Sequence, residues 1–197
     1  MEKNSNQASR GRWKLFLVLA VCASPMIASY FTYYVIKPES KTNYGAILDP
    51  RQFPVPQMNA LNADGKNQEL SSLKGKWLML QIDRAACDTH CQKKLYDMRQ
   101  LRTAQGKEME RIQRVWLITD DASIDEKLKQ GISGTEMLRV SPSILEKWLP
   151  TEQGASIYDH IYMIDPLGNL MMRFPKDADP NKIKKDLSKL LKASAIG

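Results

Sequence analysis

The first forty residues divide into a charged start and a long apolar run. Residues 15–36 contain no charged side chain, and about 20 apolar residues are enough for a helix to cross a bilayer. One acid, Glu2, and four basic residues precede the run: Lys3, Arg10, Arg12 and Lys14. Because basic residues favour the cytoplasmic side, we predict a cytoplasmic N-terminus over 1–14, a membrane anchor over 15–36 and an exported remainder.

A cleaved signal peptide is the alternative interpretation of this run. The run is longer than a usual signal core, and aromatic residues gather at its outer end as they do at a membrane interface: Tyr30, Phe31, Tyr33 and Tyr34. These two features favour an uncleaved anchor. Cys22, inside the run, is expected to be a membrane-buried thiol with no role.

Beyond the anchor, residues 37–56 are rich in proline and polar residues and predict a linker that holds the domain off the membrane. Residues 57–197 are enough for one domain. The hydrophobic pattern there predicts a hairpin (58–70), a strand (76–83), a helix (87–105), a strand (111–119), helices (121–130 and 143–148), a hairpin (158–174) and a final helix capped by Asp177 or Asp179.

This order of elements predicts an α/β fold, a mixed sheet flanked by helices. The strand over 76–83 is too apolar for a sheet edge, so we place it centrally, covered on both faces. Chemistry on such sheets is normally found where the chain leaves the carboxyl end of a central strand. Cys87 and Cys91 lie just beyond that end.

Cys87 and Cys91 are the only cysteines outside the membrane segment. On a helix, residues four apart share a face, so the two sulfurs can form a bond or hold one soft metal ion. A helix N-terminus also lowers the pKa of a nearby thiol. In an exported, oxidising compartment, idle thiols are not expected. A structural disulfide, a redox-active disulfide and a metal site therefore remain open, beside the simpler interpretation of two small buried hydrophobes.

A disulfide within one helical turn is expected to be strained, because the two α-carbons of an ideal helix stand near the upper limit for the bond. Strain raises the reduction potential and favours exchange with partners.

The net charge of +7 and the pI near 9.3 are typical of proteins that bind nucleic acid or anionic lipid. An exported domain excludes nucleic acid. Many of the lysines lie on the final helix, where they are expected to form a solvated face, with docking to an acidic partner or to anionic lipid as the alternative.

Several motifs together resemble the Sco/SenC family. They are an anchor, a hairpin over residues 61–66 (Leu-Asn-Ala-Asp-Gly-Lys), the segment 73–77 (Leu-Lys-Gly-Lys-Trp), a strand that runs into Cys-x-x-x-Cys, and the hairpin over 162–169. The cysteine spacing makes the resemblance specific. It implies a thioredoxin-like fold and a role in assembling cytochrome c oxidase, in a bacterial inner membrane with the domain in the periplasm.

The resemblance also implies a copper site built from the thiolates of Cys87 and Cys91 and one distant imidazole, for which His160 is the candidate. Such a protein delivers copper to the copper-bearing subunit of the oxidase or reduces that subunit's cysteines, or it acts with another assembly factor. In the family the histidine stands further ahead of the Asp-Pro turn than His160 does, and Asp88 and Gln92 replace prolines that usually flank the cysteines.

The sequence also offers other metal ligands and other functions. His90, three residues after Cys87, is a local source of imidazole. Met171 and Met172 alternate across a strand, so at most one faces the site and core packing is expected. The alternative functions are a metal-free thiol–disulfide oxidoreductase and a non-catalytic, membrane-tethered chaperone. No peroxidase, serine hydrolase or nucleotide-binding motif is present in the sequence.

Overall fold

The computed structural model describes residues 5–36 and 43–194. In the first of these ranges, only the side chains of residues 13–35 are described. The chain divides into two compact units, Met1–Thr42 and Asn43–Gly197.

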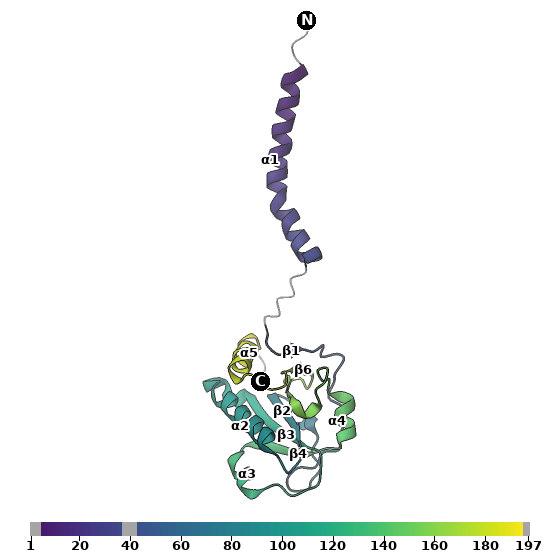
Figure 1. Ribbon diagram of the computed structural model, residues 1–197, viewed down its shortest axis with the longest axis vertical. Coiled ribbons are helices and arrows are strands. Elements are labelled where there is room, and N and C mark those ends of the chain that lie inside the picture. The colour runs from purple at the N-terminus through teal and green to yellow at the C-terminus, as the bar shows by residue number, and fades with distance from the viewer. Residues whose placement is uncertain (1–4, 37–42, 195–197) are drawn as a thin grey trace. The chain divides into compact units, whose positions relative to one another are not determined.

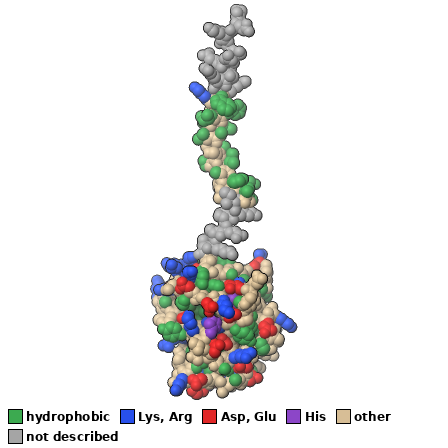
Figure 2. All heavy atoms as spheres, viewed as in Figure 1, with side chains coloured by type: hydrophobic (Ala, Val, Ile, Leu, Met, Phe, Trp, Pro, Cys, Tyr) green, Lys and Arg blue, Asp and Glu red, His purple; other side chains and the backbone are tan. Residues whose placement is uncertain are grey.

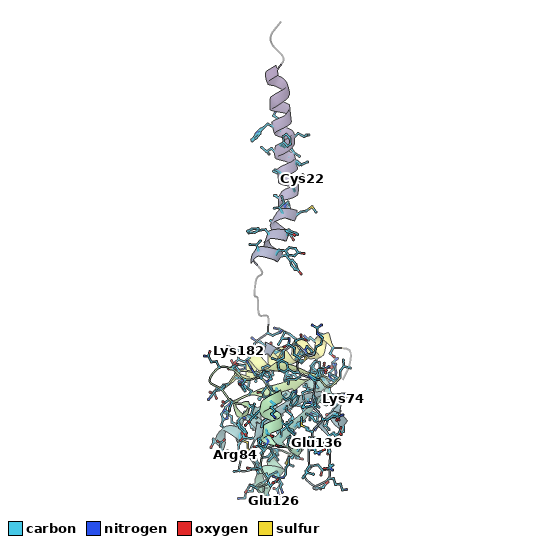
Figure 3. All side chains as sticks on the ribbon, turned by 90° about the vertical axis from the view of Figure 1, so that its right-hand side faces the viewer. Cys22, Lys74, Arg84, Glu126, Glu136 and Lys182 are labelled. Carbon is cyan, nitrogen blue, oxygen red and sulfur yellow. A yellow bond between two sulfur atoms is a disulfide. The ribbon has the colours of Figure 1, made fainter. Side chains whose placement is uncertain are left out.

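The first unit is a single helix. Helix α1 (Ser5–Phe31) continues into one π-helical turn, η1 (Thr32–Ile36) (Figure 1). Within it, Trp13–Val35 is a 23-residue stretch with a mean hydropathy of 1.9, long and apolar enough to cross a membrane. Its side chains point outward all round, and the Cys22 thiol is exposed among them (Figure 3).

The second unit is built on a mixed six-stranded sheet, counted over the described residues, in the order β1-β6-β5-β2-β3-β4 (Figure 1). Central strand β2 pairs in parallel with β3 and antiparallel with β5. The strands are β1 (Ala46–Ile47), β2 (Trp77–Asp83), β3 (Ile112–Ile118), β4 (Thr135–Arg139), β5 (Ile161–Ile164) and β6 (Leu170–Arg173). The predicted fold class and the central position of β2 are confirmed.

Helices cover both faces of this sheet. The α-helices are α2 (Thr89–Thr103), α3 (Glu126–Gly131), α4 (Pro142–Trp148) and α5 (Pro180–Ala193), and the 3-10 helices are η2 (Leu70–Leu73), η3 (Gly106–Arg111) and η4 (Ile157–Asp159). Helix α4 packs on one face, and α2 and α5 pack on the other. As predicted, Asp179 caps α5: its carboxylate accepts a hydrogen bond from the Asn181 amide at 2.9 Å, and Pro180 follows in the first turn.

Strand β2 distributes its side chains between the two faces in strict alternation. Leu78, Leu80 and Ile82 join the core under α4. Trp77 and Met79 join the core under α2 and α5. Because side chains alternate along a strand, the next residue on the α2 side is Gln81, which is fully buried. A polar amide is thereby fixed on the face that carries the cysteines.

The structure corrects part of the linker predicted over 37–56, of which 37–42 lie outside the described residues. Residues 43–56 belong to the compact domain. They contain β1, which pairs with β6. The buried carboxylate of Asp186 on α5 holds this segment, accepting hydrogen bonds from the backbone amides of Tyr44 at 2.7 Å and Gly45 at 2.9 Å. A side chain on Gly45 would collide with Met172, since an added Cβ would stand 2.7 Å from its sulfur. The linker prediction followed composition, which does not reveal these tertiary contacts.

Other predicted elements also differ from those in the structure. Strand β4 was not predicted, and the helix predicted over 121–130 begins only at Glu126, after a seven-residue irregular segment. The predicted first hairpin is reduced to isolated bridges that Leu61 makes to Asn67 and to Arg139. The second hairpin is confirmed, with Gly168 closing its turn at φ +93°.

Acidic and basic side chains are interspersed over the face of the domain shown in Figure 2. On that face the excess positive charge does not form one continuous patch.

Candidate functional site

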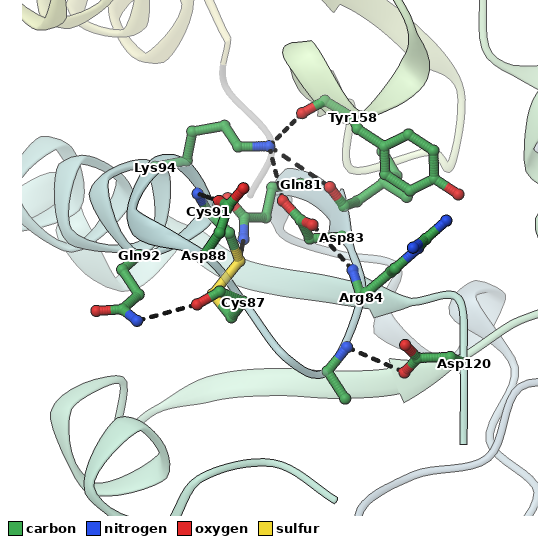
Figure 4. The surroundings of a disulfide bond; sticks show 12 residues. Gln81, Asp83, Arg84, Cys87, Asp88, Cys91, Gln92, Lys94, Asp120 and Tyr158 are labelled. Carbon is green, nitrogen blue, oxygen red and sulfur yellow. Dashed lines mark hydrogen bonds and ion pairs between the residues drawn. A yellow bond between two sulfur atoms is a disulfide. The ribbon is translucent and has the colours of Figure 1, made fainter. Parts of the chain in front are cut away.

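Cys87 and Cys91 form a disulfide at the carboxyl end of β2 (Figure 4). Helix α2 begins at Thr89, after Asp88, whose carboxylate accepts the Cys91 amide at 2.9 Å. Cys87 therefore precedes the helix, and the prediction that both cysteines lie on one helical face is wrong. Their α-carbons are 5.1 Å apart, which is in the ordinary range for a disulfide.

The backbone of Cys87 is in the left-handed region, with φ +36°. For a residue with a side chain this conformation costs about 1–2 kcal/mol. A turn in which the Cys87 amide donates to the Arg84 carbonyl at 3.1 Å holds the residue there. The separation of the α-carbons thus does not show the strain predicted for a bond within an ideal helical turn; the strain that the structure shows lies in the backbone of Cys87, before the helix.

Both cysteines are covered by apolar neighbours. Cys87 exposes 2% of its surface and Cys91 none. The two belong to a cluster with the buried residues Ala85, Leu95, Trp116, Ile118, Ile124 and Ile132. A partner thiol can reach the Cys87 sulfur only after the segment between β2 and α2 moves.

Only a few polar contacts hold that segment. The Ala85 amide donates to the Asp120 carboxylate at 3.0 Å, and the Gln92 side chain donates to the Cys87 carbonyl at 2.9 Å (Figure 4). Breaking two such hydrogen bonds costs about 1–3 kcal/mol in all. Opening of this short segment would in addition expose the buried side chains of Ala85 and Cys87, and it costs less than unfolding of the domain because β2 and α2 on either side stay in place.

The side chain of Gln81, on β2, contacts the cysteine pair. Its side-chain nitrogen lies 3.5 Å from the sulfur of Cys91 and donates to it, while its side-chain oxygen has no hydrogen-bond partner among the described residues. The apolar character of the rest of β2 hid this residue from prediction. The signal was present, because Gln81 is the one polar residue between Trp77 and Ile82.

A buried cation lies beside the pair. Lys94, three residues after Cys91, is 3.4 Å from the Asp83 carboxylate and donates to the carbonyls of Ile82 and Tyr158 (Figure 4). Burial lowers the pKa of the Lys94 amine below its usual 10.5, although Asp83 acts in the opposite direction. Through the Tyr158 carbonyl, Lys94 joins the start of α2 to η4, directly before His160.

His160 lies just before β5 and is fully buried. Its Nδ1 is 2.9 Å from the Phe174 carbonyl, and its Nε2 is 3.4 Å from the Glu152 amide. The carbonyl needs a donor and the amide needs an acceptor, so the ring is neutral with its proton on Nδ1. Burial lowers the pKa of His160. Both ring nitrogens are thus occupied by backbone groups, and the structure does not bring His160 to the cysteines as a ligand.

The other candidate ligands are also engaged elsewhere. His90, in the first turn of α2, has its Nε2 3.3 Å from the Asp177 carboxylate and a side chain 39% exposed. Met172 is fully buried in the core under α5, and Met171 packs against the same core. Core packing, the expected role of the methionines, fits these positions.

The copper ligands implied by the resemblance can be compared with the site directly. Nowhere in 5–36 and 43–194 do three or more His, Cys, Asp or Glu residues form a group that could hold a metal. The structure supplies two sulfurs, joined to each other, and no imidazole beside them. The present geometry does not fit a three-ligand copper site, so that ligand set stays a prediction.

Two family models match the chain. One, described as a transmembrane-like, thioredoxin-like C-terminal domain, matches residues 77–194, and the other, a transmembrane-like N-terminal domain, matches residues 6–35. The first covers more than half of the chain, and the protein therefore belongs to this transmembrane-like, thioredoxin-like family. The comparison with curated proteins gives no match.

Solved Sco structures share the fold. Yeast Sco1 with copper bound aligns at a TM-score of 0.61 and 12% identity, over 73% of this chain and 95% of Sco1. A SCO1/SenC lipoprotein from Bacillus anthracis aligns at 0.54 and 22%, over 74% and 99%. BsSco, described as having a disulfide switch and as one of the cytochrome c oxidase assembly proteins, aligns at 0.52 and 18%, over 74% and 98%. At these identities the comparison confirms the Sco-like fold and no more.

The environment of His160 makes the stability of the domain depend on pH. Below the ordinary histidine pKa of 6.5 the unfolded chain takes up a proton that folded His160, with its lowered pKa, does not. The unfolded state then binds more protons, so the free energy of unfolding falls as the pH drops through this range. We expect His160→Gln, which can still pair with both backbone groups, to reduce this loss. Urea denaturation at about pH 7 and about pH 5 measures the fall in the free energy of unfolding for the unaltered protein and for His160→Gln. An equal fall in the two proteins would contradict a neutral, buried His160 as its cause.

Proposed function

We propose that this chain is a membrane-anchored, Sco-type assembly factor that exchanges electrons through Cys87 and Cys91. Its partner would be the copper-bearing subunit of cytochrome c oxidase or another factor that assembles it. The observation that carries the proposal is the cysteine pair itself, held at the carboxyl end of the central strand with Cys87 in a strained backbone. The fold shared with BsSco and its disulfide switch supports it.

In the proposed reaction, the thiolate of reduced Cys87 attacks a disulfide of the partner. One partner sulfur leaves as a thiolate and takes a proton, and a mixed disulfide remains. The thiolate of Cys91 then attacks the Cys87 sulfur and releases the second partner sulfur. Two electrons have reduced the partner disulfide, and the Cys87–Cys91 bond seen here is the product. A dithiol protein of the same compartment would reset it.

The structure favours Cys87 as the attacking residue. It precedes α2, its conformation is strained, and its segment is held by few contacts. Cys91 is anchored in the first turn of the helix, with its sulfur against Gln81. Cys91 is therefore suited to resolving the mixed disulfide.

This division of roles predicts an asymmetric result for two variants of the full chain, both with Cys22→Ser so that no third thiol interferes. Cys91→Ser should accumulate a mixed disulfide with the oxidised copper-binding domain of the oxidase subunit, because the resolving thiol is missing. Cys87→Ser should form little. Non-reducing electrophoresis followed by peptide mapping measures the adduct. Equal trapping by both variants would contradict the assigned roles, and none by either would remove the redox function and leave copper carriage or a non-catalytic chaperone.

The proposal places the domain outside the cytoplasm. The basic residues before the apolar run support this orientation, as does an oxidising compartment for the disulfide. A reporter enzyme that folds only after export, fused after Gly197, should be active, and one that works only in the cytoplasm should be inactive. The mature chain should keep its N-terminal Met or begin at Glu2. The opposite reporter pattern would overturn the orientation, and a mature N-terminus near Tyr30 would overturn the anchor.

Copper carriage is a second candidate function. Two facts favour it: the adjacent thiols would form a soft donor pair once reduced, and the copper-bound yeast Sco1 shares the fold. Cys87, Cys91 and His160 would be the ligands, as the resemblance implies, and His160 would first have to break one of its backbone hydrogen bonds.

The copper content of the anaerobically reduced chain tests this candidate. Binding of one copper ion per chain that Cys87→Ser or Cys91→Ser abolishes would support carriage. If His160→Gln then weakens cupric binding, the implied ligand set is correct, whereas a loss confined to His90→Gln would favour the local imidazole. Copper content that neither cysteine variant changes would exclude carriage through this site.

A further inference from the structure

We infer that Gln81 makes the Cys87–Cys91 disulfide easier to reduce, because its amide is better paired with the free sulfur of Cys91 than with the bonded one. The inference deepens the proposed redox function and rests on it. It assigns to Gln81 a part in the reaction, since its side chain touches one of the two reacting sulfurs.

The position of Gln81 leaves its side-chain amide few possible hydrogen-bond partners. The alternation of β2 directs it to the α2 side, after Trp77 and Met79. The residue is fully buried, so bulk water does not form hydrogen bonds with its polar atoms. The sulfur of Cys91, at 3.5 Å, is the hydrogen-bond partner that the described part of the chain provides for this side chain.

In the oxidised protein this pairing is poor. The Gln81 nitrogen donates to a disulfide sulfur, which is a weak acceptor, and the Gln81 oxygen is buried without a partner. An unpaired buried acceptor carries a full desolvation penalty. The disulfide form therefore gains little from this amide, whose hydrogen bond goes to a weak acceptor.

Reduction improves the pairing when the free sulfur of Cys91 is a thiolate. It then becomes a charged acceptor for the Gln81 N–H, and charge-assisted hydrogen bonds are about twice as strong as neutral ones. As a thiol, Cys91 can donate to the Gln81 oxygen only after the amide turns over, which takes the N–H groups away from the sulfur, so this form gains little. The thiolate therefore carries the stabilisation, and it favours the dithiol side of the redox equilibrium.

Replacement of Gln81 by methionine tests the inference, since methionine keeps the unbranched shape but has neither the N–H donor nor the oxygen. In the full chain carrying Cys22→Ser, equilibrated in detergent with mixtures of reduced and oxidised glutathione, Gln81→Met should shift the equilibrium about tenfold toward the disulfide. Quenching with acid and alkylation of free thiols, followed by mass spectrometry, gives the fraction reduced. No shift, or a shift toward the dithiol, would overturn the inference.

Gln105→Met is the matched control. The Gln105 amide donates to the Leu101 carbonyl and accepts from the Ser188 hydroxyl, so its loss should lower stability without moving the redox equilibrium. An equal shift in the control would mean that glutamine loss acts through general destabilisation, and the inference would be wrong.

A measurement on the unaltered side chain keeps the test decisive if Gln81→Met does not fold. The side-chain amide resonances of Gln81, assigned by NMR with Cys22→Ser as the only change, should move strongly between the oxidised and reduced forms, more than those of Gln105. Unchanged Gln81 resonances would contradict the inference. Failure of mixed-disulfide trapping together with a clear Gln81 shift would refute the proposed partner exchange and leave the inference about Gln81 intact.

Discussion

The short connection between the end of β2 and the start of α2 is the constraint on which the site depends. Strand β2 is buried on both faces, so its position is fixed, and α2 must begin within a few residues to cover it. This places Cys91 over Gln81 and leaves Cys87 before the helix in a left-handed turn. The Asp88 cap determines that the helix starts after Cys87.

The same connection explains why the cysteine pair can be both buried and reactive. Apolar neighbours exclude water from the sulfurs, while the segment that carries Cys87 is held by a few hydrogen bonds and contains one strained residue. Local opening of this segment would release the strain and expose the sulfur without disturbing the central strand. The buried Lys94 and the partly exposed Asp83 form an ion pair beside the site.

Much of the fold could be predicted from the sequence. The strongly apolar character of β2, the Asp-Pro-Leu-Gly turn and the Asp179 cap are local signals, and each was confirmed. Residues 43–56 and β4 were missed because their structure depends on distant partners, Asp186 and β3 respectively.

The site was predictable only in part. The cysteine pair follows from its spacing and its place after a central strand, but the sequence could not show that a cap at Asp88 would exclude Cys87 from the helix. His160 illustrates the same limit, because its backbone partners at Glu152 and Phe174 lie 8 and 14 residues away in the chain. Gln81 and Lys94 had a signal, namely polar residues within buried patterns, whose importance depends on the packing of α2 over β2.

The reduction potential of the Cys87–Cys91 bond, measured in the full chain with Cys22→Ser, tests the central claim most directly. Structural disulfides of exported proteins generally have potentials below about −300 mV. With a strained Cys87 and an amide that favours the dithiol, we expect a potential above that limit, within reach of cellular thiol proteins. A value well below about −300 mV would show that the bond is a structural crosslink and would contradict the account.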